Sequence, residues 1–242
     1  MQSHTQKYLK LFVFVLSLTL PTSLWAQTLE DEFRSNNTAP TFKMTGEVAL
    51  LSHYVKNGLS QSNKDPALQG SFWFNFGPQF RMGLWGSNVN YEGGNDHFNL
   101  NLNADLKIDF SQTTNGILKY SQNQYYKSGD RNGNTLAFHL NFGTYRVTYE
   151  NESNWEGTDD RSTRFAFGKK SDVFGTWKWD NELGYNTPQV DSITSYFDFR
   201  TGLGTKVGNV IFFEGTVTAT SSPSQFEGSG DVFLILSAST QF

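Results

Sequence analysis

Apolar and polar side chains alternate with a period of two along most of this chain. The clearest run is residues 98–110, in which every even-numbered residue is apolar and every odd-numbered residue is polar or charged. Successive side chains of a β-strand point to opposite faces, so this run has one apolar face and one polar face. An α-helix would scatter the same residues around its whole circumference. The alternation therefore restricts the chain to β-structure.

The same alternation recurs at intervals and predicts 12 strands in all. Clear runs occupy 72–76, 80–85, 135–142, 145–150, 197–203 and 232–238, and weaker ones occupy 42–56, 116–126, 162–169, 174–185 and 207–220. Several runs approach 10–13 residues, which suits a tilted membrane-spanning strand of about 9–11 residues better than the usual 5–6 residues of soluble sheets.

The connections between these strands are alternately long and short. Long ones lie at 57–66, 127–134, 151–162, 186–194 and 221–231, short ones at 77–78, 112–115, 143–144 and 206–208, and connections of moderate length at 92–97 and 168–173. Outer-membrane barrels join their strands by short periplasmic turns and longer external loops. We therefore predict an all-β fold, a single antiparallel transmembrane β-barrel of about 12 strands spanning residues 42–242 and located in the bacterial outer membrane.

The composition fits this prediction and excludes several classes of protein. The chain holds 22 Phe, 10 Tyr, 6 Trp and 22 Gly, yet its charge is only −4 and it has no Cys. The lack of Cys excludes disulfides, thiolate metal sites and a cysteine nucleophile. No basic patch is present, so we expect no nucleic-acid partner. Mean hydropathy is −0.49, because only every second residue of a barrel strand has to be apolar.

Both ends of the chain resemble export and assembly signals. Residues 1–26 have an early positive charge, an apolar stretch and a small residue at Ala26, and predict a secretory signal peptide. A membrane anchor is the alternative, but the apolar stretch is about half the length of a span. We expect residues 27–41 to be a flexible lead-in. Phe242 ends the final strand, as in outer-membrane proteins read by the barrel assembly machinery, and outer-membrane lipid and lipopolysaccharide are the expected surroundings.

Residues 52–89 carry a recognisable set of short motifs. They include Ser52-x-Tyr54, Gly58-Leu59-Ser60-Gln61-Ser62, Pro66-Ala67-Leu68-Gln69-Gly70 and Gly83-x-Trp85-Gly86-Ser87-Asn88. This region resembles Gcw_chp, a family of uncharacterised proteobacterial proteins. The resemblance implies an outer-membrane β-barrel and names no activity.

The strand phase predicts which side chains line the lumen. The expected set combines charges of both signs with two His and two Trp: Glu47, His53, Trp73, Arg81, Trp85, Asp105, Lys107, Asp109, Lys119, His139, Arg146, Glu150, Arg164, Asp198, Arg200 and Glu214. We predict a narrow passive channel for small polar solutes, lined by these side chains. The alternative is a plugged barrel whose charges neutralise one another and whose loops contact a partner or the envelope.

No set of residues predicts catalysis, a metal or a cofactor. Ser52 and His53 are adjacent, so on a strand they point to opposite faces and cannot form a nucleophile–base pair. Residues 129–134 resemble a calcium loop only faintly, and a hairpin loop of turn-forming residues is the preferred interpretation. Asp159-Asp160 is interpreted as part of a solvated loop rather than a cation bridge to lipopolysaccharide. We therefore expect a non-enzyme without cofactors.

Aromatic residues on the opposite phase are expected to face outward, in the girdles that barrels place at the membrane interfaces. This set is Tyr54, Tyr91, Tyr149, Trp177, Trp179 and Tyr185.

The phase assignment can be tested on neighbouring residues of one strand. Leu102→Arg puts a charge on the lipid face and should cost about 2–4 kcal/mol of unfolding free energy near the bilayer midplane. Asn103→Arg, on the lumen face, should be tolerated. Urea unfolding from lipid vesicles measures both variants, and equal losses would show that the assigned phase is incorrect.

Overall fold

The computed structural model describes residues 42–91, 94–208 and 210–242. The predicted signal peptide, residues 1–26, and the predicted lead-in, residues 27–41, lie outside the described residues. No helix in the described ranges is long and apolar enough to cross a bilayer.

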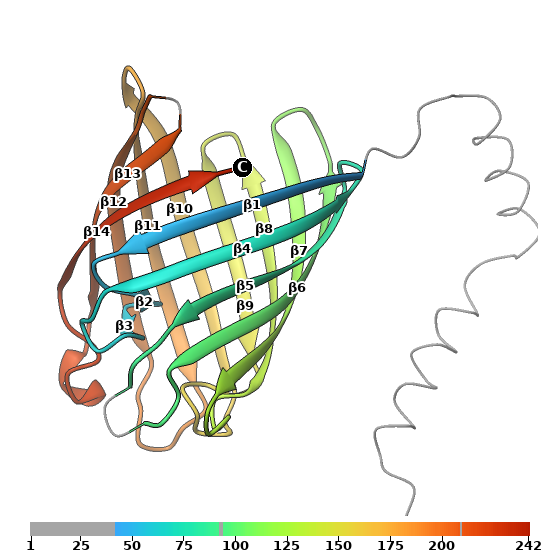
Figure 1. Ribbon diagram of the computed structural model, residues 1–242. Helices are drawn as coiled ribbons and strands as arrows, with labels where there is room; N and C mark the ends of the chain where they lie inside the picture. The colour runs from blue at the N-terminus through green and yellow to red at the C-terminus, as the bar shows by residue number, and fades with distance from the viewer. Residues whose placement is uncertain (1–41, 92–93, 209) are drawn as a thin grey trace, which may run out of the picture. The chain divides into compact units, whose positions relative to one another are not determined.

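Twelve antiparallel strands form a closed barrel, which confirms the predicted fold (Figure 1). In ring order after β1 (Phe42–Leu51) they are β4 (Ala67–Phe76), β5 (Phe80–Asn88), β6 (Phe98–Asp109), β7 (Thr114–Tyr126), β8 (Gly133–Phe142), β9 (Tyr145–Glu152), β10 (Ser162–Phe174), β11 (Trp177–Pro188), β12 (Tyr196–Val207), β13 (Ile211–Thr220) and β14 (Phe233–Gln241). The β1 strand pairs with both β4 and β14, so the ring has no free edge among its strands. Closure matters because an unpaired backbone group has no water to bond to inside a bilayer.

The seam between β1 and β14 is closed by the last residue of the chain. Gly46 N donates to the Phe242 carbonyl at 2.8 Å, and Phe242 N donates to the Gly46 carbonyl at 3.0 Å. The Phe242 ring lies over Gly46, where a Cβ atom would come within 2.5 Å of it. Glycine at this position thus makes room for the terminal ring on the outside of the barrel. The assembly role of Phe242 stays a prediction.

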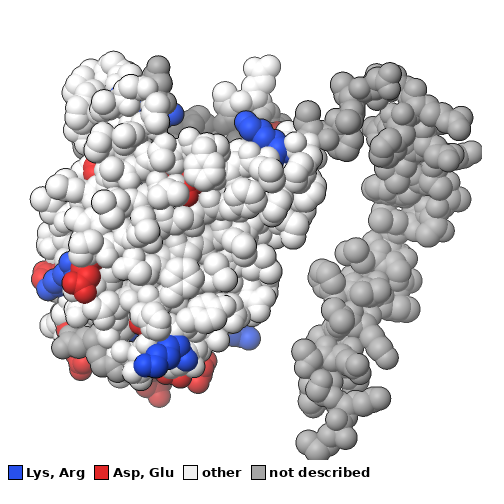
Figure 2. All heavy atoms as spheres, in the orientation of Figure 1, with Lys and Arg blue, Asp and Glu red and all other residues white. Residues whose placement is uncertain are grey.

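The two faces of each strand differ as the alternation requires. Large apolar side chains point outward and are exposed, for instance Phe72, Leu102, Phe138, Phe167 and Leu236. Figure 2 shows an outer wall almost free of charged side chains. Most of the charged side chains visible in this view lie at the lower edge. Lipid therefore covers the apolar residues that a soluble protein would bury in a core.

The connections sort to opposite ends of the barrel. The turns at 77–79, 110–113, 143–144, 175–176 and 208–210 are two to four residues long and define the short-turn end. The segments 52–66, 89–97, 127–132, 153–161, 189–195 and 221–232 define the long-loop end. A short 3-10 helix, η1 (Pro223–Phe226), lies in the last of these.

Several strand limits differ from those predicted. The β1 strand ends at Leu51, because the chain then bends away from the wall instead of continuing to residue 56. The β10 strand continues to Phe174, and the turn at Gly175 has a φ of 53°. Gly168, predicted to begin this turn, instead pairs within the sheet opposite Glu182.

The outward placement of Tyr54 and Tyr91 was wrong. Both lie beyond the end of a barrel strand, so the two-residue period no longer sets their direction. Tyr91 is only 7% exposed and packs with Val89 and Tyr125, with Tyr54 against the same cluster. Tyr149, Trp179 and Tyr185 are exposed, as expected for outward-facing rings.

The structure also supplies a better inward control for the phase test. Asn103 is 8% exposed and accepts a hydrogen bond from Ser121 Oγ, so arginine does not fit there. Ala49→Arg places the charge in a lumen cavity beside Glu47 and should be tolerated. Val48→Arg, one residue away on the lipid face, should cost about 2–4 kcal/mol, like Leu102→Arg. The same unfolding measurement applies to all three.

Candidate functional site

The connection between β1 and β4 forms a small hairpin that enters the lumen. We call residues 52–66 the inward hairpin. It contains β2 (Val55–Lys56) and β3 (Leu59–Ser60), joined by Asn57 and Gly58 with φ values of 50° and 81°. Two positive φ values in a two-residue loop are the type I′ turn, for which Asn-Gly is the preferred sequence. The local sequence thus accounts for the turn.

The tip of the inward hairpin contacts the opposite side of the barrel. In the ring of twelve strands β1 and β9 are six places apart, on opposite walls. Lys56 Nζ nevertheless forms an ion pair with Glu152 of β9 at 2.9 Å, and Asn57 Nδ2 donates to Glu150 of the same strand at 3.2 Å. A Cβ on Gly58 would lie 2.6 Å from Thr220 Cγ2 of β13. The hairpin therefore crosses the lumen near the long-loop end.

Two apolar clusters hold the inward hairpin in place. Leu59 packs with Trp155, Tyr196 and Phe226, which come from the 153–161 loop, β12 and η1. On the other side of the hairpin, Tyr54 packs against the cluster of Val89, Tyr91 and Tyr125. Burial raises the pKa of the Tyr54 hydroxyl above its ordinary value.

The buried polar side chains of the hairpin are hydrogen-bonded between these clusters. His53 Nε2 and Ser60 Oγ share a hydrogen bond of 2.7 Å, and Gln61 accepts one from the Tyr91 hydroxyl at 2.8 Å. Burial, followed by the positive charge of Lys64, lowers the pKa of His53, so its imidazole is neutral at pH 7. Burial opposes the charge on Lys56, but Glu152 together with Tyr125, Glu150 and Glu156 outweighs burial and raises the pKa of that ammonium group. These hydrogen bonds and the ion pair between Lys56 and Glu152 hold the hairpin in one position in the lumen.

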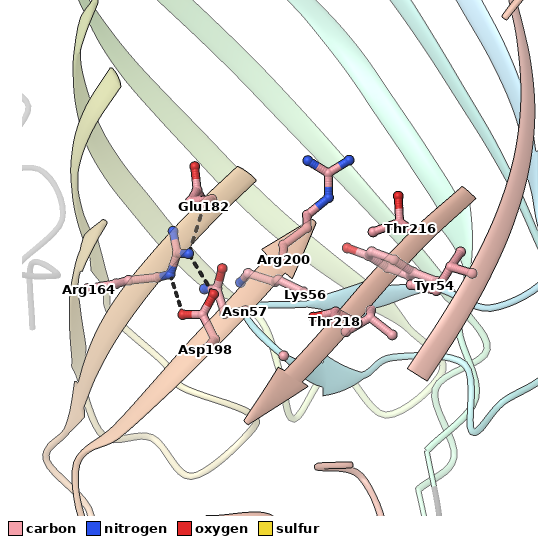
Figure 3. Close-up of a pocket in the computed structure, with 12 residues that line it drawn as sticks. Tyr54, Lys56, Asn57, Arg164, Glu182, Asp198, Arg200, Thr216 and Thr218 are labelled. Carbon is pink, nitrogen blue, oxygen red and sulfur yellow. Dashed lines mark hydrogen bonds and ion pairs between the residues drawn. The ribbon is translucent and has the colours of Figure 1, made fainter. Parts of the chain in front are cut away.

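A chain of charged residues covers the wall that faces the inward hairpin. We call it the ion-pair ladder: Arg146, Arg164, Asp180, Glu182, Asp198, Arg200 and Glu214, from β9 to β13. Arg164 lies at its centre, with Nη2 at 2.7 Å from Asp198 and 2.8 Å from Glu182 (Figure 3). Arg146 pairs with the other oxygen of Glu182, and Arg200 pairs with Glu214 at 3.0 Å.

A cavity of about 270 Å³ separates the inward hairpin from the ion-pair ladder. Tyr54, Lys56 and Asn57 bound it on the hairpin side (Figure 3). Arg164, Arg200, Thr216 and Thr218 are among the residues that bound it on the wall side. The cavity thus lies between Lys56 of the hairpin and the charged residues of the ladder.

The structure places the sequence-predicted lumen residues on the face opposite the lipid. Those in strands alternate with exposed apolar residues: Glu47, Trp73, Arg81, Trp85, Asp105, Lys107, Asp109, Lys119, His139, Arg146, Glu150, Arg164, Asp198, Arg200 and Glu214. His53 lies in the bend after β1 instead of on a strand. Five of them, Arg146, Arg164, Asp198, Arg200 and Glu214, meet in the ladder.

The other predicted lumen residues are distributed around the remaining wall. Arg81 pairs with Asp105 at 2.6 Å and lies over the Trp73 ring, 4.2 Å from its centroid. His139 shares a hydrogen bond with Thr148, and Trp85 contacts Tyr54 edge to face. No group of three side chains suited to hold a metal ion occurs within the described ranges.

Sequence reasoning missed several residues of the site. Asp180 and Glu182 alternate with Trp179 and Leu183, so the phase of the weak run at 174–185 could have revealed them. The inward hairpin could have been found from Asn57-Gly58 as a turn, but nothing local indicates that it points into the lumen. Lys56 and Glu152 are 96 residues apart in the sequence.

The family comparison agrees with this geometry. Residues 35–233 match the family described as "Bacterial protein of unknown function (Gcw_chp)". The chain belongs to the Gcw_chp family. In this Gcw_chp barrel, the first three motifs that suggested the family, from Ser52 to Gly70, form the inward hairpin and the start of β4. The family signature thus coincides with the segment that crosses the lumen.

Solved structures with the same fold are porins of very different sequence. A structure described as "KdgM porin" is 8% identical, with a TM-score of 0.54, over 82% of this chain and 98% of that one. A NanC porin structure is 7% identical, with a TM-score of 0.55, over 83% and 99% of the two chains. At this identity the likeness establishes the fold alone. A comparison with curated proteins gives no match. The closed barrel and its apolar outer wall make the Gcw_chp protein an outer-membrane protein.

The centre of the ladder can be tested by removing its buried cation. Arg164→Met leaves Asp198 without an ion-pair partner and Glu182 with Arg146 alone, in a site where the Arg164 side chain is 7% exposed. Removing one partner of a buried ion pair costs about 3–5 kcal/mol of unfolding free energy. Lys178→Met, which removes the exposed pair with Asp172, should cost about 0–1 kcal/mol. Urea unfolding in vesicles compares them, and similar losses would contradict a structural role of the ladder.

Asp96 ties the 89–97 segment to the 127–132 segment, which offers a pH test. Burial alone would raise the pKa of Asp96, but N–H groups of Gly129, Ser128 and Lys127 and the Ser128 hydroxyl hydrogen-bond its carboxylate and lower the pKa below the ordinary 3.8. The stabilisation is therefore complete above the unfolded-state pKa and is lost as pH falls through the lower folded-state pKa. Asp96→Asn should lower the melting temperature by a constant amount above about pH 5, and by progressively less below about pH 4. A difference that does not depend on pH would contradict this role.

Proposed function

We propose that this protein is a narrow outer-membrane channel for small polar solutes, with the inward hairpin as its constriction. The observation that carries the proposal is the hairpin itself. It crosses a lumen lined with polar and charged groups and leaves a cavity of about 270 Å³ beside the ion-pair ladder. Channels select solutes by pore width and by the charges that line the narrowest point.

The size of the barrel supports this proposal. A barrel of 8 strands has an interior that side chains fill, and one of 16 strands leaves a wide aqueous channel. Twelve strands fall between these cases, so one short hairpin is enough to narrow the lumen. The similar structures, KdgM porin and NanC porin, are described as porins and share this architecture.

A second function is favoured by a different observation. Nine of the twelve charged residues predicted for the lumen form ion pairs with other described residues, and Glu47, Lys119 and Glu150 form none there. A barrel whose charges neutralise one another and whose hairpin is held by two apolar clusters could instead be a non-transporting scaffold for the long loops. We further propose that outer-membrane lipid and lipopolysaccharide surround the wall, and that the assembly machinery reads Phe242.

Single-channel recording on purified protein in planar bilayers separates the two functions. The channel predicts discrete current steps from the unmodified protein. Replacing residues 53–65 by a short Gly-Ser linker should then increase the step, because it removes the constriction from a lumen of fixed strand number. Asp191→Asn, in the exposed 189–195 loop, is the control and should leave the step unchanged.

The recordings can also contradict the channel. If the unmodified protein gives no current steps and the linker variant does, the barrel is plugged by the hairpin. The absence of current steps from both proteins would identify a non-transporting scaffold. Equal steps from both would show that the hairpin is not the constriction.

A further inference from the structure

A second cavity lies away from the inward hairpin, at the short-turn end of the barrel. It has a volume of about 510 Å³ and is bounded by inward-facing residues of β1 and β10–β14 and by the turn residues Thr176 and Val210. Three of these are lysines from three adjacent strands: Lys170 of β10, Lys178 of β11 and Lys206 of β12. In outer-membrane barrels this end faces the periplasm. We call this space the mouth cavity.

The mouth cavity differs from the ladder in its charge balance. Each arginine of the ladder has a carboxylate within ion-pair distance. At the mouth only Lys178 does, with Asp172 at 3.1 Å, and that carboxylate is 81% exposed to solvent. Across the described residues, Lys170 and Lys206 have no carboxylate within 4.0 Å. The acidic residue that lines the cavity, Glu47, accepts a hydrogen bond from Gln241 at 3.1 Å. Positive charge therefore exceeds negative charge around this cavity.

An apolar surface lies among these charges. Phe212 of β13 is on the inward phase of its strand, where most neighbours are polar, and it lines the cavity with Val210. Its ring occupies the space that a side chain at position 204 would need, and Gly204 leaves that space free. An inward-facing ring is therefore accommodated by a glycine on the adjacent strand. A cavity with cationic groups and one aromatic wall fits a ligand that has both an anionic group and a ring or carbon face.

We propose that the mouth cavity binds small anionic solutes, carrying a carboxylate or phosphate on a ring-sized body, through Lys170, Lys178 and Lys206. This proposal rests on the proposed channel function and extends it, because it names the class of solute that binds at the periplasmic end. The inward hairpin, held against the self-neutralised ladder, then sets the width of the pathway, and the lysines of the mouth cavity attract the anion. Fields from like charges in a recess raise the local concentration of the opposite ion.

Calorimetric titration of the full-length protein in detergent tests the site. The probes are glucuronate and glucose, which have the same ring and differ in one carboxylate, at low ionic strength to limit screening. Glucuronate should bind about tenfold or more tightly than glucose, and the K170Q/K178Q/K206Q variant should lose that difference. Lys169→Gln is the matched control, since Lys169 is the outward neighbour of Lys170, beside Tyr145.

Three outcomes would overturn the proposal. These are equal binding of glucuronate and glucose, undiminished glucuronate binding by the triple variant, and an equal loss in Lys169→Gln. Inorganic phosphate, which has no ring, should bind more weakly than glucuronate, and equal binding would overturn the role given to Phe212.

Bilayer recordings on the same preparation distinguish this site from the channel itself. Current steps without selective glucuronate binding would overturn the mouth site and leave the channel intact. Selective binding without current steps would overturn the channel and leave the mouth site as a binding site of a closed barrel.

Discussion

The structure depends on the requirement that every backbone amide and carbonyl inside a bilayer has a hydrogen-bond partner. The β1–β14 seam meets this requirement by making the sheet continuous, and the last residue, Phe242, extends the pairing to Gly46. Once the ring is closed, outward residues need only be apolar, and inward residues are free to be charged. The ion-pair ladder, the inward hairpin and the mouth cavity all exist in the interior that closure creates.

Charges inside this barrel have two different arrangements. Near the hairpin they are shielded from solvent and therefore paired, because an isolated buried charge is costly. At the short-turn end they are hydrated, so Lys170 and Lys206 can remain without a carboxylate partner. The same strands, β10 to β12, contribute to both arrangements at different depths. Depth along a strand thus decides whether a lumen charge supports the structure or is available to a solute.

The barrel could be predicted from the sequence because it follows from local alternation. In the run at 98–110 the phase alone identifies Asp105 and Lys107 as inward and Leu102 as outward, and the structure has the same arrangement. The method failed at Tyr54 and Tyr91, where the strands had ended and the period no longer applied. The site was harder still. Asn57-Gly58 signals a turn, but its position in the lumen depends on Glu152 and Tyr196, whose partnership is set by the closed ring rather than by neighbouring residues.

The contacts of the inward hairpin also impose an order on folding. Lys56 meets a residue 96 positions later, and Asn57 meets one 139 positions later. Contacts this distant carry a large loop-closure cost until the intervening strands are in place. Loop closure therefore favours docking of the hairpin after β9, β12 and β13 have joined the sheet. A nascent barrel passes through a stage in which its cylinder is assembled and its interior is still unobstructed, and maturation ends when a segment made early in synthesis moves in to narrow it.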